Sequence, residues 1–514
     1  MTVDWTFGYV ADIDYTYGYY SELNPLRVKL AFLNAGLVFP EFGTACELGF
    51  GQGMSANIHA AASVTKWYGT DFNPAQASFA ADMATVSDSG AKLYDESFLE
   101  FAERTDLPEF DYIGLHGVWS WISDENRSII VKFLRRKLKV GGVLYISYNT
   151  MPGWASFAPM RHLMTEHAEV IGVDGQGIVK RIAGAIDFAD KLLATSPVFA
   201  KANPLVTERV TTMKGYNAHY LAHEFFNKDW LPMHFATMAE WLTSAKLDYA
   251  CSANYMDHID AVNHTSEQQA FLNDIPDLMF RQSVRDFMVN QQFRKDYWVK
   301  GARKLSIVER QEALRKLKVI LLKDRSEVSL KVTGAIGESS MSEAVYNPIL
   351  DLLVDHKPKT LGEIEIAIRE KGINFNQLIE AVVLLSGAGH LAAVQEDDFA
   401  IARAKQHTDK INASIIDKAR GSSDINFLAS PVIGGGVAIG RFQQLFILAL
   451  SRGKQTPAGQ AEFAWQILVA QGQKIVKDGK VLGTQEENLA ELTVQATVFT
   501  EKQLPILAAL QVVS

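Results

Sequence analysis

The first 150 residues alternate short apolar runs with helical segments, and this alternation constrains the fold more than any other feature. Five runs rich in β-branched, aromatic or continuous apolar residues predict strands: TACELGF, KWYGTDF, AKLYDES, FDYIGLHG and GGVLYISYN. The clearest helix between them, NRSIIVKFLRRKLKV, carries one apolar face. Strands that alternate with helices predict an α/β fold, in which helices cover both faces of a parallel sheet.

Two further strands are expected much later in the chain. Residues 156–231 have a helical pattern without a strand run, whereas the stretches HFATMAEWLTSAKLDYACSA and FRKDYWVKG predict a helix and two strands. We therefore expect a first domain at 1–155, a helical cap at 156–231, and a sheet that residues 232–303 complete.

The C-terminal 200 residues predict two smaller units. Residues 304–400 are expected to begin with a charge-rich linker, at 302 to about 335, and to continue as a winged-helix-like module in which Thr360 and Glu363 have the spacing of a capping box. The helices of this module mix acids and bases, which favours packing or protein contact over DNA binding. Residues 401–514 are expected to be mostly helical with glycine-rich breaks.

Composition excludes several classes of protein. The net charge of −9 argues against nucleic acid as a partner. Only two cysteines are present, Cys46 and Cys251, so no disulfide scaffold is expected and a reducing compartment is favoured. The first residues do not read as a signal peptide, and no apolar run is long enough for membrane insertion. We expect a cytoplasmic protein.

A glycine-lined turn follows the first predicted strand. Glu47 is followed by Gly49, Gly51 and Gly53, which would let the backbone pass close to a ligand at a helix N-terminus. The spacing is not the G-x-G-x-x-G of a dinucleotide site, and the preceding carboxylate would repel a pyrophosphate but suit a cationic amine. An ordinary tight turn is the alternative.

Polar residues also end the next three strands. Asp71, 24 residues beyond Glu47, stands where a ribose diol would be bound, next to Phe72. The third strand ends in residues that could bind the amine and ring of an adenine or, alternatively, cap a helix: Asp95, Glu96, Ser97 and Phe98. The fourth strand ends at His116 and Gly117.

Taken together, residues 42–150 resemble a class I S-adenosylmethionine-dependent methyltransferase, through ELGFGQG, GTDFNP, DESF, FDYIGLHG and GGVLYISYN. The resemblance implies a Rossmann-like sheet with S-adenosyl-L-methionine as methyl donor. It places Glu47 and the three glycines at the methionine part, Asp71 at the ribose, Glu96 or its neighbours at the adenine, and His116 near the sulfonium and the acceptor.

A narrower resemblance extends further along the chain. The segments YNAHYLAHEFFNKDWLPMHFATMAEWLTSAKLDYACSA and VRDFMVNQQFRKDYWVKG are similar to the bacterial methyltransferase regulatory domain. The whole arrangement resembles rickettsial-type protein lysine methyltransferases that modify outer membrane proteins, which implies a lysine-bearing protein substrate. A small-molecule or saccharide O-methyltransferase and a binding protein with a relic cofactor site are the alternatives, and a homodimer is left open.

Candidates for the acceptor side are less specific. An amine acceptor needs positioning more than a dedicated base, and we consider Tyr17, His116, Trp119 and Asn149 as catalytic candidates. Trp119, Trp121 and Trp154 could line an apolar channel or belong to the core. The tyrosine-rich N-terminus predicts either a lid over the cofactor, through Tyr15, Tyr17 or Tyr20, or a packed arm.

A histidine pair is the remaining candidate for a site. His219 and His223 stand at i, i+4 with Glu224 beside them, but the spacing is not H-E-x-x-H. Asp229 and His234 are the nearest further ligands. We expect core or cap-interface histidines here and no metal site.

Overall fold

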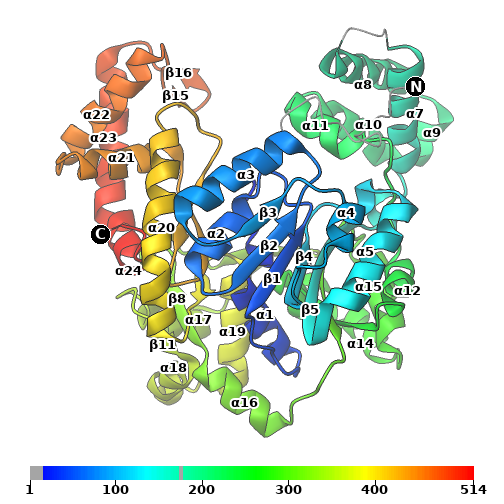
Figure 1. Ribbon diagram of the computed structural model, residues 1–514, viewed down its shortest axis with the longest axis horizontal. Helices are drawn as coiled ribbons and strands as arrows, with labels where there is room; N and C mark the ends of the chain where they lie inside the picture. The colour runs from blue at the N-terminus through cyan, green and yellow to red at the C-terminus, as the bar shows by residue number, and fades with distance from the viewer. Residues whose placement is uncertain (1–15, 173–176, 514) are drawn as a thin grey trace.

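A seven-stranded sheet forms the centre of the computed structural model, which describes residues 16–172 and 177–513 (Figure 1). The strand order is β3-β2-β1-β4-β5-β7-β6. The first five strands are parallel, and β7 lies antiparallel between β5 and β6. The expected five strands and the two late ones are confirmed: β1 (Thr44–Leu48), β2 (Lys66–Thr70), β3 (Lys92–Tyr94), β4 (Phe110–Leu115), β5 (Leu138–Asn149), β6 (Leu247–Ser252) and β7 (Phe293–Lys300).

Side chains alternate between two cores on opposite faces of this sheet. Ala45, Tyr112 and Tyr145 join one core, while their chain neighbours Cys46 and Ile113 join the other. The first face is covered by α1 and α2, and the second by α4, α5 and α12. The bounds are α1 (Pro25–Asn34), α2 (Met54–Ala62), α3 (Pro74–Ser87), α4 (Phe98–Glu103), α5 (Asp124–Lys137) and α12 (Phe235–Thr243).

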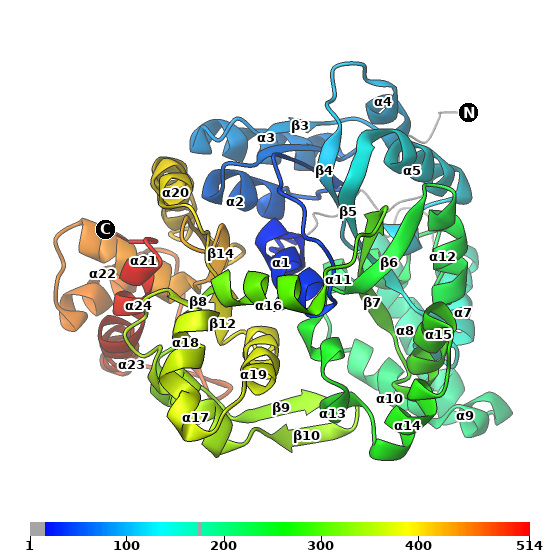
Figure 2. The same ribbon diagram turned by 90° about the horizontal axis from the view of Figure 1, so that it is seen from below.

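The segment between β5 and α12 is helical and has a core of its own. Aliphatic side chains make up most of that core, and its aromatic part is a cluster in which Trp154 packs on Phe157, Phe225 and Trp230. Figures 1 and 2 place this cap and the C-terminal helices at opposite sides of the molecule. The cap helices are α6 (Met151–Trp154), α7 (Ala158–Val170), α8 (Ile178–Ala194), α9 (Val198–Ala202), α10 (Pro204–Met213) and α11 (Ala218–Phe225).

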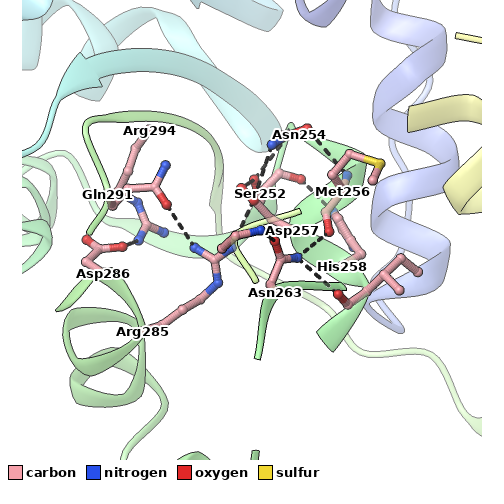
Figure 3. Close-up of polar contacts among 12 residues, drawn as sticks. Ser252, Asn254, Met256, Asp257, His258, Asn263, Arg285, Asp286, Gln291 and Arg294 are labelled. Atoms are coloured by element: carbon pink, nitrogen blue, oxygen red, sulfur yellow. Dashed lines mark hydrogen bonds and ion pairs between the residues drawn. The ribbon is translucent and has the colours of Figure 1, made fainter. Parts of the chain in front are cut away.

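A buried ion-pair network attaches β7 to its surroundings (Figure 3). Arg294 on β7 binds Asp286 at 2.5 Å and Asp296 at 2.8 Å, and Tyr148 on β5 donates to Asp296 at 2.9 Å. Close by, Arg285 binds Asp257 at 2.9 Å. Between β6 and β7, Asp257 lies in η3 (Tyr255–His258), and Arg285 and Asp286 lie in α15 (Leu278–Met288). The other elements of this stretch are α13 (Asp260–Asn263) and α14 (Ser266–Asn273).

The expectation of a linker before the third unit is wrong, because residues 302–335 fold into helix and strand. Ser306 and Glu309 form a capping box that starts a helix, and the apolar run that follows is buried as the middle strand of a small antiparallel sheet, β11-β8-β12. The elements are α16 (Ile307–Lys316), β8 (Lys318–Leu321), η4 (Arg325–Glu327), β9 (Lys331–Gly334) and β10 (Gly337–Ser340).

Three α-helices, one 3-10 helix and two short strands complete this unit. The capping box of Thr360 and Glu363 is confirmed at the start of α18. That the module is of the winged-helix type stays a prediction, as do the expected domain boundaries. The elements are α17 (Glu343–Asp351), β11 (Lys359–Thr360), α18 (Leu361–Ile368), η5 (Arg369–Lys371), α19 (Phe375–Gly387) and β12 (Leu391–Ala393).

The C-terminal region is mostly helical, as expected, with a glycine-rich hairpin, β13–β14. Its first helix, α20, packs on α2 and α3. Within the described ranges, no helix is long and apolar enough to cross a membrane. The elements are α20 (Asp398–Lys418), β13 (Phe427–Ser430), β14 (Gly435–Ala438), α21 (Arg441–Ser451), α22 (Pro457–Ala470), β15 (Val476–Lys477), β16 (Lys480–Val481), α23 (Gln485–Val498), η6 (Phe499–Gln503) and α24 (Leu504–Ala509).

Candidate functional site

A pocket lies at the carboxyl ends of the first four strands. This edge of a parallel sheet is where the strand order reverses and where ligands bind in such folds. The pocket brings together ten of the residues predicted from sequence: Glu47, Gly49, Gly51, Asp71, Phe72, Glu96, Ser97, Phe98, His116 and Gly117.

The glycine turn between β1 and α2 requires its glycines. Gly49, Gly51 and Gly53 have φ of 73°, 58° and 67°, a left-handed conformation that side chains disfavour. A Cβ at Gly49 would lie 2.6 Å from Val118, across the pocket. Gly53 instead is the N-cap of α2, where a Cβ would lie 2.5 Å from Ala80, so it packs α2 against α3 and does not line the pocket.

Glu47 presents a buried carboxylate to the pocket. Its side chain is 3% exposed, and Oε2 has no hydrogen-bond partner among the described residues. Burial, with a contribution from the charge of Asp71, raises the pKa of Glu47 to about 8. An ammonium group is the ligand that best compensates such a carboxylate, so the residue fits the methionine end of the implied cofactor.

Asp71 ends β2 and is held by backbone donors. The amide of Gly51 donates to Oδ2 at 2.8 Å and that of Asn73 to Oδ1 at 3.0 Å. Burial nevertheless raises the pKa of Asp71 to about 6. These two bonds fix the carboxylate beside the glycine turn, with lone pairs left to accept from a diol.

The end of β3 combines a capping role with a place in the pocket. Ser97 caps α4, where its hydroxyl accepts from the amide of Glu100 at 3.3 Å, and it also lines the pocket. Glu96 accepts from Arg104 at 2.6 Å through Oε1, whereas its Oε2 has no partner within the described part of the chain. Asp95 is exposed and does not line the pocket.

His116, at the end of β4, is fixed by two aromatic neighbours. Its Nδ1 is 2.7 Å from the hydroxyl of Tyr145, and the ring of Tyr20 stacks on its imidazole with centroids 3.6 Å apart. Burial lowers the pKa of His116 to about 3, so the ring is neutral at physiological pH. The amide of Gly117 donates to Ser147 at 2.8 Å, which orients the backbone beside the pocket.

Three acceptor-side candidates lie elsewhere. The ring of Tyr17 packs edge-on against Phe79, at 5.0 Å. Trp119 is fully buried and donates to the sulfur of Met233, and Asn149 is 3% exposed. Side chains two positions apart in a 3-10 helix point in different directions, so in η2 (Trp119–Trp121) Trp121 lines the pocket while Trp119 joins the core.

The other aromatic candidates also divide between the pocket lining and the protein core. Tyr20 lines the pocket, whereas Trp154 donates to the carbonyl of Gln292 at 2.9 Å within the cap core. Tyr15 lies outside the described residues.

Sequence reasoning missed seven lining residues. Phe50 lies inside the motif ELGFGQG, and Gln76 lies just beyond the motif GTDFNP. A list of candidates that included every residue of these two turns and the residues just after them could have found both. Asp229 comes from the segment after the cap and carries no local signal. The full set is Phe50, Gln76, Val118, Ile122, Ser123, Asn126 and Asp229.

The histidine pair does not assemble a site among the described side chains. His223 is 4% exposed within the cap, and His234 stacks on Phe287 with centroids 6.1 Å apart. No group of three or more potential metal ligands occurs in the described part of the chain.

Comparisons with known proteins agree with this architecture. Residues 217–300 match a family described as a predicted methyltransferase regulatory domain. The chain is 39% identical to an uncharacterized protein of Synechocystis sp. (sll1526), over 98% of this chain and 99% of the relative. It is 27% identical to an uncharacterized protein of Rickettsia prowazekii (RP789), over 56% of this chain and 53% of the relative.

Among solved structures, PKMT2 from Rickettsia typhi in complex with AdoHcy matches with a TM-score of 0.68 and 16% identity. The match covers 94% of this chain and 98% of that one. At this identity the likeness shows a shared fold along nearly the whole length of both chains.

Proposed function

Because the chain belongs to the family of class I S-adenosylmethionine-dependent methyltransferases that carry the methyltransferase regulatory domain, we propose that it methylates lysine side chains of a protein substrate. The name of the structural relative, PKMT2, supports this proposal. So does the resemblance of the sequence to rickettsial-type protein lysine methyltransferases. A cytoplasmic location and a homodimer stay predictions.

The observation that carries the proposal is the charge of the pocket. Four carboxylates line it, and the lining residues that the structure describes include neither lysine nor arginine. Like charges brought together in a buried site are costly unless cations join them. The surplus of carboxylates, which ionise when cations bind, therefore favours a cationic acceptor over a neutral alcohol or sugar.

Each of the four carboxylates can be assigned a partner. Glu47 would hold the ammonium of the cofactor and Asp71 its ribose hydroxyls, while Glu96 is already neutralised in part by Arg104. Asp229 is half-buried, comes from the segment that joins the cap to the sheet, and has no role in this scheme. It is our candidate for binding the ammonium of the incoming lysine.

The bound cofactor supplies an electrophilic methyl group on a sulfonium. The lysine nitrogen must lose a proton before it forms the new N–C bond, because an ammonium has no free electron pair. The S–C bond to the methyl group would break in the same step, with the neutral thioether as leaving group. Tyr20 and Trp121 would exclude water from the acceptor side, which lowers the pKa of an amine. Positioning by these walls, and not a catalytic triad, is expected to provide most of the rate.

The function is tested with methyl-labelled S-adenosylmethionine and a bacterial membrane-protein fraction as the acceptor. After acid hydrolysis, we expect the label in N-methyllysine. Label found only in small molecules, or in base-labile esters, would contradict the proposal. Titration calorimetry with S-adenosylmethionine, on wild type and on Asp71→Ala, checks the cofactor site separately.

His116 allows a second test that separates the two acceptor classes. A hydroxyl acceptor needs a general base, whose removal typically costs 10²–10⁴-fold in rate. The neutral imidazole of His116 is the candidate for that role. With an amine acceptor, we expect His116→Asn to lower kcat by less than about tenfold. A larger loss, with cofactor affinity preserved, would favour an O-methyltransferase.

A further inference from the structure

The N-terminal segment that enters the pocket also contacts the C-terminal hairpin. Tyr19 directly precedes Tyr20, whose backbone is extended, and in extended backbone successive side chains point to opposite sides. Tyr20 faces the pocket and stacks on His116. Tyr19 faces away from the pocket, toward the hairpin β13–β14, more than 400 residues later in the sequence.

Tyr19 fits closely against that hairpin. The amide of Gly436 donates to its hydroxyl at 2.7 Å, and the same hydroxyl is 3.0 Å from Nε2 of His59 on α2. The ring of Phe427 lies 5.0 Å away, centroid to centroid. Since the hydroxyl accepts from Gly436, its own proton can be donated to His59, so one buried hydroxyl joins the hairpin to the helix of the glycine turn.

The hairpin has glycine where Tyr19 approaches it. A Cβ at Gly436 would lie 2.9 Å from the tyrosine ring, and one at Gly435 would lie 2.6 Å from its hydroxyl. Both distances are too short for any side chain to be added without moving Tyr19. The glycine-rich break in the C-terminal region therefore leaves the space that Tyr19 of the N-terminal segment occupies.

Further bonds hold the same segment on both sides. The amide of Tyr20 donates to Ser55 at 2.9 Å, in the first turn of α2. The side chain of Asn24 donates to the carbonyl of Ile433, in the turn of the hairpin, at 3.2 Å. Residues 19–24 thus lie between α2, which follows the glycine turn, and the C-terminal region, and are hydrogen-bonded to both.

We propose that the C-terminal hairpin controls the cofactor pocket through Tyr19, which acts as a positioning residue for Tyr20. When the hairpin is packed against Tyr19, Tyr19 fixes the backbone that places the Tyr20 ring over His116. This inference deepens the proposed function, on which it rests, by assigning the C-terminal region a role in completing the methyl-transfer site.

A double-mutant cycle on the full-length chain tests the proposal, with the affinity for S-adenosylhomocysteine as readout. Tyr20→Ala should weaken binding about tenfold through the loss of a half-buried aromatic wall of the pocket. Gly436→Ala, which displaces Tyr19, should weaken binding about fivefold in wild type but less than about twofold in the Tyr20→Ala background. Such non-additivity is expected only if Gly436 acts through Tyr20.

Two controls accompany the cycle. Gly421→Ala changes another glycine of the C-terminal region, where a Cβ would meet no atom closer than 3.9 Å, and should leave the affinity unchanged. Tyr19→Phe keeps the ring but loses the acceptor for Gly436, and should act in the same direction as Gly436→Ala with a smaller effect. Thermal melting shows whether each variant is folded.

The outcomes are distinct. Equal effects of Gly436→Ala in both backgrounds, or no effect in wild type, would overturn the positioning role and leave the proposed function intact. Failure of the wild-type protein to bind S-adenosylhomocysteine would overturn the proposed function and this inference together.

Discussion

The carboxylates of Glu47 and Asp71 stand at the ends of neighbouring parallel strands, and the charge of Asp71 adds to burial in raising the pKa of Glu47 to about 8. The protein therefore keeps Glu47 largely protonated at neutral pH until a cation binds. If Glu47 holds the ammonium of the cofactor, as proposed above, this pairing would couple cofactor binding to the release of a proton.

Cofactor affinity should consequently depend on pH. Under the proposal that the ammonium binds the ionised form of Glu47, affinity for S-adenosylmethionine should rise between pH 6 and 8, by up to about tenfold per pH unit. Calorimetry in buffers of different ionisation enthalpy would measure the released proton. Glu47→Gln should abolish this slope and weaken binding by about tenfold or more. Asp229→Asn is the matched control and should keep the slope.

The same carboxylate should lower the stability of the free protein. Its folded pKa of about 8 lies above the ordinary value of 4.5, so the folded state binds more protons than the unfolded chain between these values. The contribution of Glu47 to the free energy of unfolding is therefore lost as the pH rises from 4.5 to about 8. Glu47→Gln should raise Tm relative to wild type by a few degrees at pH 8, and by less at pH 5. An equal shift at both pH values would contradict the raised pKa.

Asp229 should affect the acceptor and not the cofactor. We expect Asp229→Asn to raise KM for the methyl-accepting protein about tenfold, the loss typical of one charge-assisted hydrogen bond. Affinity for S-adenosylhomocysteine should change less than about twofold, because Glu47 and Asp71 are untouched. Asp229→Glu should restore part of the loss. A variant whose KM is unchanged would remove Asp229 from acceptor binding.

The ion pairs on β7 should be essential for stability. Arg294→Met leaves Asp286 and Asp296 buried without their cation, and removing one partner of a buried pair typically costs about 3–5 kcal/mol. Urea unfolding would measure this loss. The control, Arg325→Met, breaks an exposed pair with Asp351 and should cost about 1 kcal/mol or less. Similar losses in both variants would argue against a special role for the network.

Strand positions were predictable because each strand is a local apolar run bounded by turn residues. The ligand-facing ends of β1 and β2 were predictable for the same reason, since Glu47 and Asp71 directly follow such runs. It was not predictable which of Trp119 and Trp121 faces the pocket, because this depends on a single 3-10 turn after β4. Asp229 could not be found locally, since the fold of the whole cap decides where that residue returns to the sheet.

The placement of β7 also sets the order in which the sheet can form during synthesis. It pairs with β5 from Val143 to Asn149, yet it begins only at Phe293, 144 positions after β5 ends. At ribosomal speeds of ~5–20 residues per second, the edge of β5 waits roughly 7–30 s for its partner. An unpaired apolar edge recruits other chains. The nascent protein therefore passes through an interval in which it is prone to aggregate, and this interval ends when β7 emerges.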